Sequence, residues 1–399
     1  MNIKIAGFRS GLNYNDKLNT ITGEFVKSVS EELGEELKES SLEDYDCDLK
    51  LIFIQSGGSE GLFLENMKVL KEPFYFLTNG SNNSLAASLE IMTYLNLHGL
   101  KGEVLHGDVP YIAGRIRALS LLGKVKKELA NTRFGVLGKP SDWLIASVPQ
   151  YETAKNKLGI RFEDVSLDEV KKNFEKTALV DASKLPAEFD KDEKIKALRV
   201  YEAFKKIAKD HNLAGFTVRC FDLLNPLKTT GCVGLSLLND SGITSACEGD
   251  IAALISMHIA RLVTGEPNFQ ANPSRISTAD NTVVFAHCTL PLAMTERFTL
   301  DTHFESGTGI AVKGYLKETD VTVLRISADL KNFFVSDGKI LRNLEEPDLC
   351  RTQIEVKLSE SVESLLKRPC GNHHIILYGH HSKELRELLK NLLDIESSL

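Results

Sequence analysis

The chain has 399 residues, a formal net charge of −7, and 26% charged side chains. This acidic balance argues against a general nucleic-acid binder, which needs a basic face for phosphates. No apolar run approaches the length of a membrane span, and the N-terminus lacks the apolar core of a signal peptide. Seven cysteines without CxxC spacing favour reduced, mostly buried thiols. We therefore expect a cytoplasmic protein with neither a nucleic-acid nor a membrane partner.

Residues 1–125 alternate apolar strands with amphipathic helices, which is the rhythm of a parallel α/β domain. The predicted strands are 2–8, 48–58, 73–80 and 102–107, and the predicted helices are 20–39 and 84–99. Polar loops at 55–60 and 78–84 follow the second and third strands, at the edge where open α/β sheets bind ligands. Asn79 in the second loop is a candidate substrate contact, although simple turn chemistry explains both loops equally well.

Residues 126–210 begin the α/β pattern again with a strand at 133–138, a loop, and further helices. From 211 to 399 the pattern changes to short strands, interrupted by one strong helix at 251–263. Segments 215–224 and 232–240 are both expected to be strands. The predicted fold is α/β: two N-terminal Rossmann-like lobes, 1–125 and 126–210, and a mostly β C-terminal domain, 211–399.

The segment Ser-Ala-Cys-Glu-Gly-Asp at 245–250 joins a short strand to the strong helix. Asp250 suits a helix cap, where backbone N–H groups favour a carboxylate. Glu248 lies among small and apolar residues, and an unpaired buried charge is too costly. It therefore needs a partner, and a metal ion is one candidate.

Histidines and acids gather at other strand ends of the same domain. His287 ends an apolar strand, where a lone histidine is more often a hydrogen-bonded core residue than a ligand. Asp301, His303 and Glu305 alternate, so a strand would present them on one face. Together with the histidines near 373, these oxygen and nitrogen donors suit Mn²⁺, Mg²⁺ or Fe²⁺ better than structural zinc.

Arg219 lies among apolar residues in a predicted strand, which indicates pairing with an anion. A structural salt bridge is the more common explanation, and a phosphate, sulfonate or carboxylate of a substrate is the alternative. Of the two C-terminal histidine pairs, we expect His373 and His374 to face a site. His380 and His381 are expected at the surface or at a helix start.

Four of these motifs together resemble one family. They are Glu-Gly-Asp before a helix, Ala-His-Cys-Thr at 286–289, Asp-Thr-His-Phe-Glu-Ser-Gly at 301–307 and Gly-Asn-His-His at 371–374. The pattern is similar to the C-terminal domain of the L-fucose isomerase and L-arabinose isomerase superfamily. The match is specific over the last 190 or so residues and architectural before them. The resemblance implies a divalent ion, commonly Mn²⁺ and otherwise Mg²⁺, Fe²⁺ or Co²⁺. It also implies a homo-oligomer, a trimer or hexamer, with shared active sites.

Residue roles follow from the resemblance. Glu248 matches the first acidic metal ligand, His287 a histidine ligand of the arabinose branch, and His373 the C-terminal ligand, with His374 as the other choice. The family's second acidic ligand is missing, and Asn272 stands nearest its place. Asp280 is the next acid along the chain, and its alignment is poorer.

The implied reaction is aldose–ketose isomerisation of a monosaccharide through an ene-diol. Such a reaction needs a base for the carbon-bound proton and an acid for the neighbouring oxygen. We expect Glu248 as the base, with Glu305 or Asp301 as its proton partner. Arg219, His303, His374 and Asn79 are the candidate substrate contacts. The alternatives are a sugar-binding or regulatory homologue with weak or no isomerase activity and, behind it, a lyase or epimerase.

Overall fold

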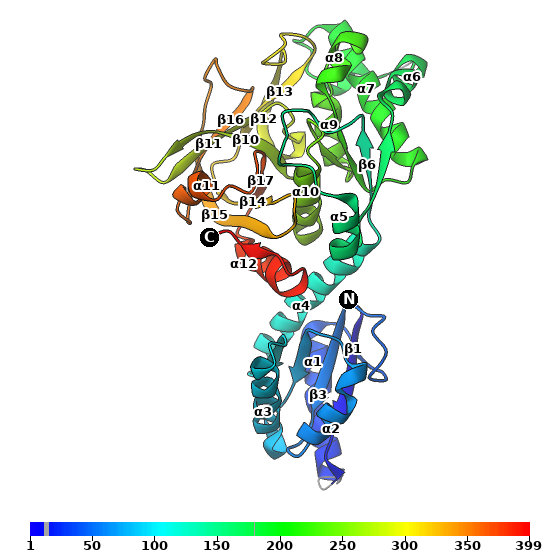
Figure 1. The fold of residues 1–399 in the computed structure, drawn as a ribbon, viewed down its shortest axis with the longest axis vertical. Helices are drawn as coiled ribbons and strands as arrows, with labels where there is room; N and C mark the ends of the chain where they lie inside the picture. Colours follow the sequence, from blue (N-terminus) through cyan, green and yellow to red (C-terminus); the bar gives the residue numbers. More distant parts are fainter. Residues whose placement is uncertain (12–15, 179) are drawn as a thin grey trace. The chain divides into compact units, whose positions relative to one another are not determined.

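The computed structural model describes residues 1–11, 16–178 and 180–399, and the chain divides into two compact units (Figure 1). The first unit is Met1–Lys127 and the second is Glu128–Leu399.

A five-stranded parallel sheet forms the centre of the first unit, with the strand order β2-β1-β3-β4-β5. Its strands are β1 (Ile3–Phe8), β2 (Leu37–Glu39), β3 (Leu49–Ile54), β4 (Phe74–Leu77) and β5 (Gly102–Leu105). Its helices are α1 (Asp16–Leu33), α2 (Glu60–Asn66), α3 (Ser84–Leu97) and α4 (Val109–Ala130). One apolar core joins α1 and α4 to the sheet, and a second joins α2 and α3. Helices on both sides explain why β3 is buried along its whole length.

The second unit contains a four-stranded parallel sheet with the order β7-β6-β8-β9. Its strands are β6 (Arg133–Leu137), β7 (Arg161–Val165), β8 (Gly215–Val218) and β9 (Thr244–Ala246). The helices of this region are α5 (Tyr151–Leu158), α6 (Leu167–Lys176), α7 (Lys191–Asp210), α8 (Phe221–Leu227) and α9 (Cys232–Asp240). The sheet therefore takes strands from both the second and the third predicted segments.

A seven-stranded, mostly antiparallel sheet follows, with the order β14-β17-β10-β11-β16-β15-β18. Its strands are β10 (Phe269–Ser277), β11 (Thr282–His287), β14 (Asp320–Ile326), β15 (Asn332–Asn343), β16 (Thr352–Leu358), β17 (His374–Tyr378) and β18 (Glu396–Ser397). A separate hairpin pairs β12 (Thr295–Asp301) with β13 (Ala311–Leu316). The short helices α11 (Glu363–Lys367) and α12 (Ser382–Glu387) lie toward the end of the chain.

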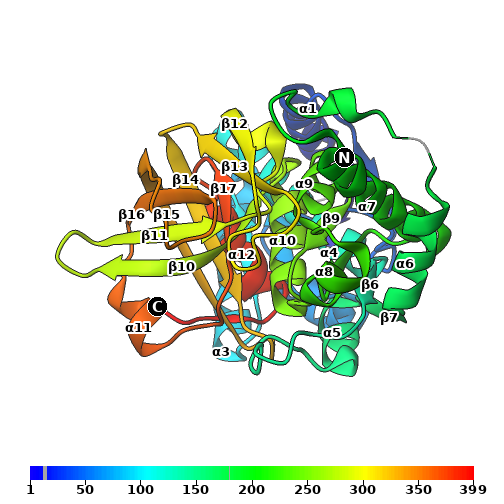
Figure 2. The same cartoon turned by 90° about the horizontal axis from the view of Figure 1, so that it is seen from above.

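Helix α10 (Ile251–Thr264) packs against β8 and β9 of the parallel sheet and against β14 and β17 of the antiparallel sheet. Figure 2 shows it between the antiparallel strands and helices α7, α8 and α9. Every residue from Ile251 to Ala260 is buried, as expected for a helix enclosed on all sides. Asp250 caps it by accepting a hydrogen bond from the Ala253 N–H, so the predicted helix and cap are both confirmed.

Two predicted strands are wrong. Segment 232–240 is helix α9, and segment 215–224 is strand β8 followed by helix α8. Burial on nearly every side of α9 hides the period that separates a helix from a strand. In 215–224 the strand ends at Val218, and the last four residues begin a short helix. The parallel-sheet units and the mostly antiparallel C-terminal region agree with the predicted fold class. The boundaries of the three predicted domains and the fucose-isomerase-type arrangement of lobes stay predictions.

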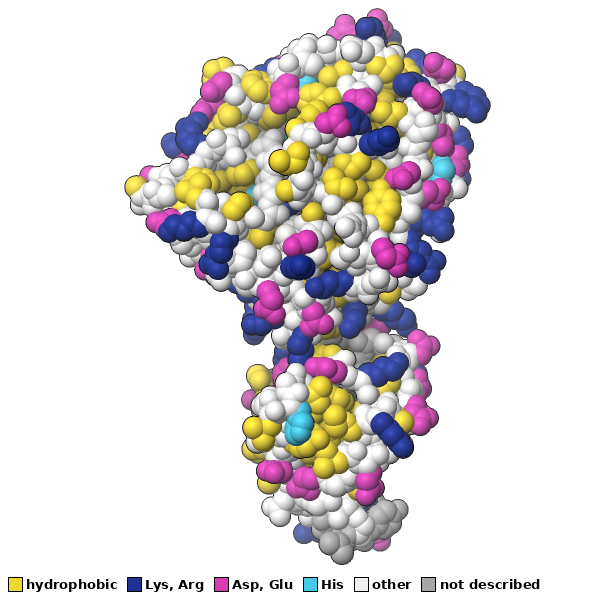
Figure 3. Space-filling model, viewed as in Figure 1, with side chains coloured by type: hydrophobic (Ala, Val, Ile, Leu, Met, Phe, Trp, Pro, Cys, Tyr) yellow, Lys and Arg dark blue, Asp and Glu magenta, His cyan; other side chains and the backbone are white. Residues whose placement is uncertain are grey.

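Acidic and basic side chains are interspersed over the face drawn in Figure 3. Among the residues that the structure describes, no helix combines the length and the apolarity that crossing a membrane requires.

Candidate metal centre

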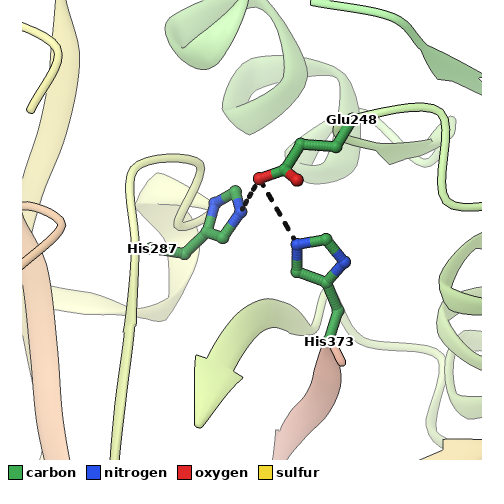
Figure 4. A group of neighbouring side chains, drawn as sticks. All are labelled: Glu248, His287 and His373. Carbon is green, nitrogen blue, oxygen red and sulfur yellow. Dashed lines mark ion pairs between the residues drawn. The ribbon is translucent and has the colours of Figure 1, made fainter. Parts of the chain in front are cut away.

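Three ligand atoms meet where the two sheets of the second unit approach each other (Figure 4). Glu248 follows β9, His287 is the last residue of β11, and His373 directly precedes β17. Glu248 Oε1 lies 3.6 Å from His287 Nε2 and 3.5 Å from His373 Nε2. All three ligand atoms fall within 4.8 Å of one another. They are the only such His, Cys, Asp or Glu group among the described residues.

The backbone around Glu248 is built for close packing. Glu248 has φ 62°, in the left-handed region that costs a non-glycine residue of order 1–3 kcal/mol. Gly249 follows with φ 72°, and a Cβ there would lie 2.7 Å from the Pro140 Cα. The side chain of Gln270 braces the turn by accepting a hydrogen bond from the Cys247 N–H at 2.8 Å. The segment at Pro140 and the side chain of Gln270 thus hold the strained backbone of Glu248 in place.

Each of the two histidines is oriented by a hydrogen bond at its Nδ1 atom. His287 Nδ1 lies 3.0 Å from the Thr289 hydroxyl. His373 Nδ1 lies 2.9 Å from Asp250 Oδ2, and a carboxylate accepts only, so this nitrogen carries the proton. Arg325, which is fully buried, pairs with the same Asp250 at 3.1 Å. A carboxylate behind a histidine is the usual way in which proteins orient a metal-binding imidazole.

Asn272 lies at the same level of the antiparallel sheet. Its strand, β10, runs between β17 and β11. Asn272 pairs with Ala286, the residue before His287, while the preceding Ala271 pairs with His374, the residue after His373. Its Oδ1 atom is buried and has no hydrogen-bond partner among the described residues.

Charge in the group is unevenly distributed. Burial raises the pKa of Glu248, but the neighbouring imidazoles of His287 and His373 outweigh it and hold the pKa well below the ordinary value. Burial lowers the pKa of His373, but the nearby carboxylates of Asp250 and Glu248 outweigh it and raise the pKa to about 9. Burial lowers the pKa of His287.

These residues fit a hard divalent cation. The 3.5–3.6 Å separations exceed ordinary hydrogen bonds, and the buried Nε2 of His373 has no hydrogen-bond partner in the described part of the chain. One carboxylate and two imidazoles form an oxygen–nitrogen donor set without thiolate. A cation among them would satisfy the orphaned Nε2 of His373.

Comparison with known proteins finds relatives among the isomerases. No family model matches the chain. The sulfoquinovose isomerase of Clostridium sp. (strain MSTE9) is 28% identical over 218 residues, which are 51% of this chain and 47% of that protein. The sulfoquinovose isomerases of Priestia aryabhattai and Priestia megaterium are each 27% identical over 300 residues, 69% of this chain and 66% of theirs. The resemblance to the L-fucose/L-arabinose isomerase-like superfamily is confirmed. The chain spans about half to two thirds of the length of these relatives.

The acids expected from the superfamily motif do not share a strand face. Strand β12 ends at Asp301, and the chain then turns, so the predicted alternation over 301–305 is wrong. Asp301 lies 3.5 Å from Arg351 Nε. Glu305 is an exposed residue whose carboxyl is partly enclosed, and this burial together with repulsion from Glu248 raises its pKa. Two glycines, at 307 and 309, have positive φ in the following turn.

His303 is a buried residue in the turn that follows β12. Its Nδ1 lies 3.0 Å from the Ser306 hydroxyl, and its ring meets Phe221 at 5.6 Å. Burial, and next the charge of His287, lower its pKa to about 4. It therefore stays neutral at physiological pH and is available as a hydrogen-bonding group.

The paired histidines separate as alternation on a strand requires. His374 points away from the three-residue group and packs against Phe285 and Phe334, with Nδ1 donating to the Asn372 carbonyl. Burial lowers its pKa to about 3. His380 is exposed and lies 3.2 Å from Asp320, while His381 begins helix α12. The surface and helix-start positions predicted for this second pair are confirmed.

Arg219 is engaged by protein groups. Its guanidinium donates to Asp142 at 2.7 Å, to Asp222 at 2.8 Å and to the Pro140 carbonyl at 2.8 Å. The salt bridge that the sequence left as the common explanation is therefore present, and these carboxylates raise the pKa of Arg219. Binding a substrate anion would require one carboxylate to move.

Asn79 belongs to the first unit and stabilises its own loop. Its Oδ1 accepts hydrogen bonds from the Ser81 N–H and the Ser84 hydroxyl, while its Nδ2 is buried without a partner among the described residues. The turn chemistry expected for this loop accounts for these contacts.

Sequence reasoning missed two residues that touch the site, Gln270 and Trp143. The Trp143 indole N–H donates to Glu248 Oε2 at 2.9 Å. Trp143 lies 105 positions from Glu248, so no local pattern reveals this contact. The only available signal was that the chain contains a single tryptophan, in a loop after a strand of the parallel sheet.

Proposed function

We propose that this chain is a metal-dependent isomerase that interconverts an aldose and a ketose. The observation that carries the proposal is the convergence of Glu248, His287 and His373 within 4.8 Å. The relatives support it because they are named sulfoquinovose isomerase. Sulfoquinovose is accordingly the first sugar to test, followed by neutral aldoses such as L-fucose and L-arabinose.

Glu248, His287, His373 and Asn272 would hold the ion. A divalent ion such as Mn²⁺ supplies stabilisation of the negative charge that develops on neighbouring sugar oxygens. The low pKa of Glu248 keeps it ionised at neutral pH, as a metal ligand requires. Asp250 and Arg325 fix the ring of His373 from behind.

Glu305 is a better proton partner than Asp301. Its pKa is raised, partly by Glu248, so it holds a proton closer to neutral pH. Asp301, in contrast, is paired with the Arg351 guanidinium. In the proposed reaction Glu248 removes the carbon-bound proton, and Glu305 exchanges a proton with the neighbouring sugar oxygen.

One observation favours a second candidate function. By its spacing from Glu248, Asn272 stands nearest the place of the superfamily's second acidic ligand, and an amide takes no proton at neutral pH. A sugar-binding or regulatory homologue with weak or no isomerase activity would tolerate this change.

Calorimetric titration of Mn²⁺ into chelator-treated protein tests the proposal first, on the wild type, Glu248→Gln and His373→Ala. Glu345→Gln is the matched control, because Glu345 pairs with Lys313 and Tyr315 on the surface. Binding that both site variants lose and the control keeps would support the metal centre. Proton NMR of each sugar in deuterium oxide then detects interconversion and exchange at carbon 2. Ion binding without turnover on any sugar would favour the binding homologue, and a well-folded wild type that binds no ion would overturn the metal-dependent reaction.

A further inference from the structure

Trp143 lies in the loop between β6 and α5 and is joined to the metal centre by a direct hydrogen bond. Its indole N–H holds Glu248 Oε2 at 2.9 Å, while Oε1 of the same carboxylate faces the two imidazoles. The two oxygens of Glu248 are thus assigned to different neighbours.

The loop that carries Trp143 is fixed to the Glu248 turn by its backbone. The Ser141 N–H donates to the Glu248 carbonyl at 3.2 Å, and Gly249 allows segment 139–141 to approach closely. Arg219 holds the same loop through Pro140 and Asp142. A tryptophan on such a loop is held in place beside the carboxylate.

Among the three residues of the centre, Glu248 has the most accessible side chain. The side chain of Glu248 keeps 14% of its surface exposed, against 5% for His287 and 0% for His373. Trp143 itself is 51% exposed, which is unusual for so large an apolar ring. Glu248 and its hydrogen-bond partner Trp143 are therefore both accessible to a small molecule.

Trp143 is the first of three aromatic rings that contact one another in turn. Trp143 and Phe221 meet edge to face at 5.1 Å, and Phe221 meets His303 in the same manner at 5.6 Å. Sugar sites commonly combine such aromatic surface with a few polar groups that fix orientation. The C–H face of a pyranose packs on an exposed ring, and its hydroxyls reach the neighbouring polar groups.

We propose that Trp143 is the substrate-contacting aromatic residue of this centre, with its exposed ring against the sugar and its indole N–H positioning Glu248. This role rests on the proposed function, since it assumes a sugar at the metal centre. It assigns the chain's single tryptophan to substrate binding and to the geometry of the ionised carboxylate.

Because Trp143 is the only tryptophan, fluorescence excited beyond the tyrosine absorption band reports on this ring alone. The probes are sulfoquinovose and L-fucose, added to protein loaded with diamagnetic Mg²⁺. We expect a saturable change in Trp143 emission for the sugar that binds. A turned-over sugar that leaves the emission unchanged at saturation would overturn the contact.

Kinetics of two variants separate the two parts of the role. Trp143→Phe keeps a ring and loses the N–H, so kcat should fall about tenfold while KM changes little, as for loss of a hydrogen bond to a charged group. Trp143→Leu also loses the ring, so KM should rise by about tenfold in addition. Ile145→Ala is the control, because Ile145 is 93% exposed in the same loop. Equal kinetics for Trp143→Leu and Ile145→Ala in folded proteins would overturn the proposal.

Failure of the proposed function is distinguishable from failure of this inference. A sugar that changes Trp143 emission without being isomerised would leave the contact standing and remove the isomerase. A sugar that is isomerised normally by Trp143→Leu would leave the isomerase standing and remove the contact. A wild type that binds none of the probes, by emission or by calorimetry, would overturn both.

Discussion

His373 Nδ1 and Asp250 Oδ2 lie 2.9 Å apart with neither side chain exposed to solvent. Asp250 also caps helix α10 and pairs with Arg325, so one carboxylate joins the longest buried helix of the second unit to the proposed ligand. The cap predicted from sequence is therefore also the group that orients His373.

Asp250→Asn should weaken divalent-ion binding about 10–100-fold, the usual effect of losing the carboxylate behind a metal-binding histidine. Asparagine retains an oxygen for the Ala253 N–H, so the helix cap should survive. Calorimetry with Mn²⁺ measures the affinity, and circular dichroism checks the fold. Asp301→Asn, which changes a surface ion pair with Arg351, serves as the control. Wild-type affinity in a folded Asp250→Asn protein would refute the orienting role.

Two substitutions of Asn272 with opposite expected effects on ion affinity test it as a metal ligand. Its buried Oδ1 has no hydrogen-bond partner among the described residues, so Asn272→Ala should cost little stability through that atom and weaken ion binding by about tenfold. Asn272→Asp places a charge where the superfamily has an acid and should tighten binding by a similar factor. Asn268→Ala is a matched control, because Asn268 donates to the Met257 carbonyl and should affect stability instead. Ion affinity that is the same in both Asn272 variants would exclude this ligand.

Much of the fold follows from local pattern. Alternating apolar strands and helices identified four of the five strands of the first unit's sheet, and helical periodicity with an acidic cap identified α10. Strand β2 (Leu37–Glu39) lies inside the predicted helix 20–39, so that part of the prediction is wrong. Helix α9 could not be recognised, because burial on nearly every side leaves its sequence mostly apolar and without a polar face. Pairing of β8 and β9 with β6 depends on contacts far apart in the chain, and no local signal reports them.

The candidate site likewise contains residues that a local signal marked and residues that only tertiary packing brings together. Glu248, His287 and His373 stand at strand ends, and that local signal marked them together with His303, Glu305 and His374. The family resemblance then singled out the three. The acids at 301 and 305 were placed on one strand face because they alternate, but β12 ends before the second of them. Trp143 reaches Glu248 only through tertiary packing, so its position required the structure.

Arg219→Ala should release the loop that carries Trp143, because Arg219 joins Asp142 and the Pro140 carbonyl to the start of α8. We expect kcat/KM to fall by about tenfold or more for neutral and anionic sugars alike, as misplacement of a site group causes. Steady-state kinetics with L-fucose and sulfoquinovose measure the two losses. Asp168→Ala, which removes a neighbouring surface acid outside this network, is the control. A loss confined to the sulfonated sugar would instead assign Arg219 to anion recognition.

Acid should destabilise the second unit through His258 in helix α10. Its ring lies between the Thr132 and Thr244 hydroxyls, and burial, then the charge of Arg261, lower its pKa from 6.5 to about 4. Between these two pH values the unfolded chain takes up a proton that the folded protein does not. The contribution is complete above pH 6.5 and is lost as the pH falls toward 4, on the order of 3 kcal/mol for such a shift.

His258→Gln removes this titration and keeps a side chain that can bond both hydroxyls. The free energy of unfolding from urea titrations should therefore fall less between pH 7 and pH 4.5 in the variant than in the wild type, whatever the variant's absolute stability. His303 and His374 also have lowered pKa values, so the dependence is reduced and not abolished. Identical pH dependence in His258→Gln and the wild type would show that His258 is not protonated on unfolding in this range.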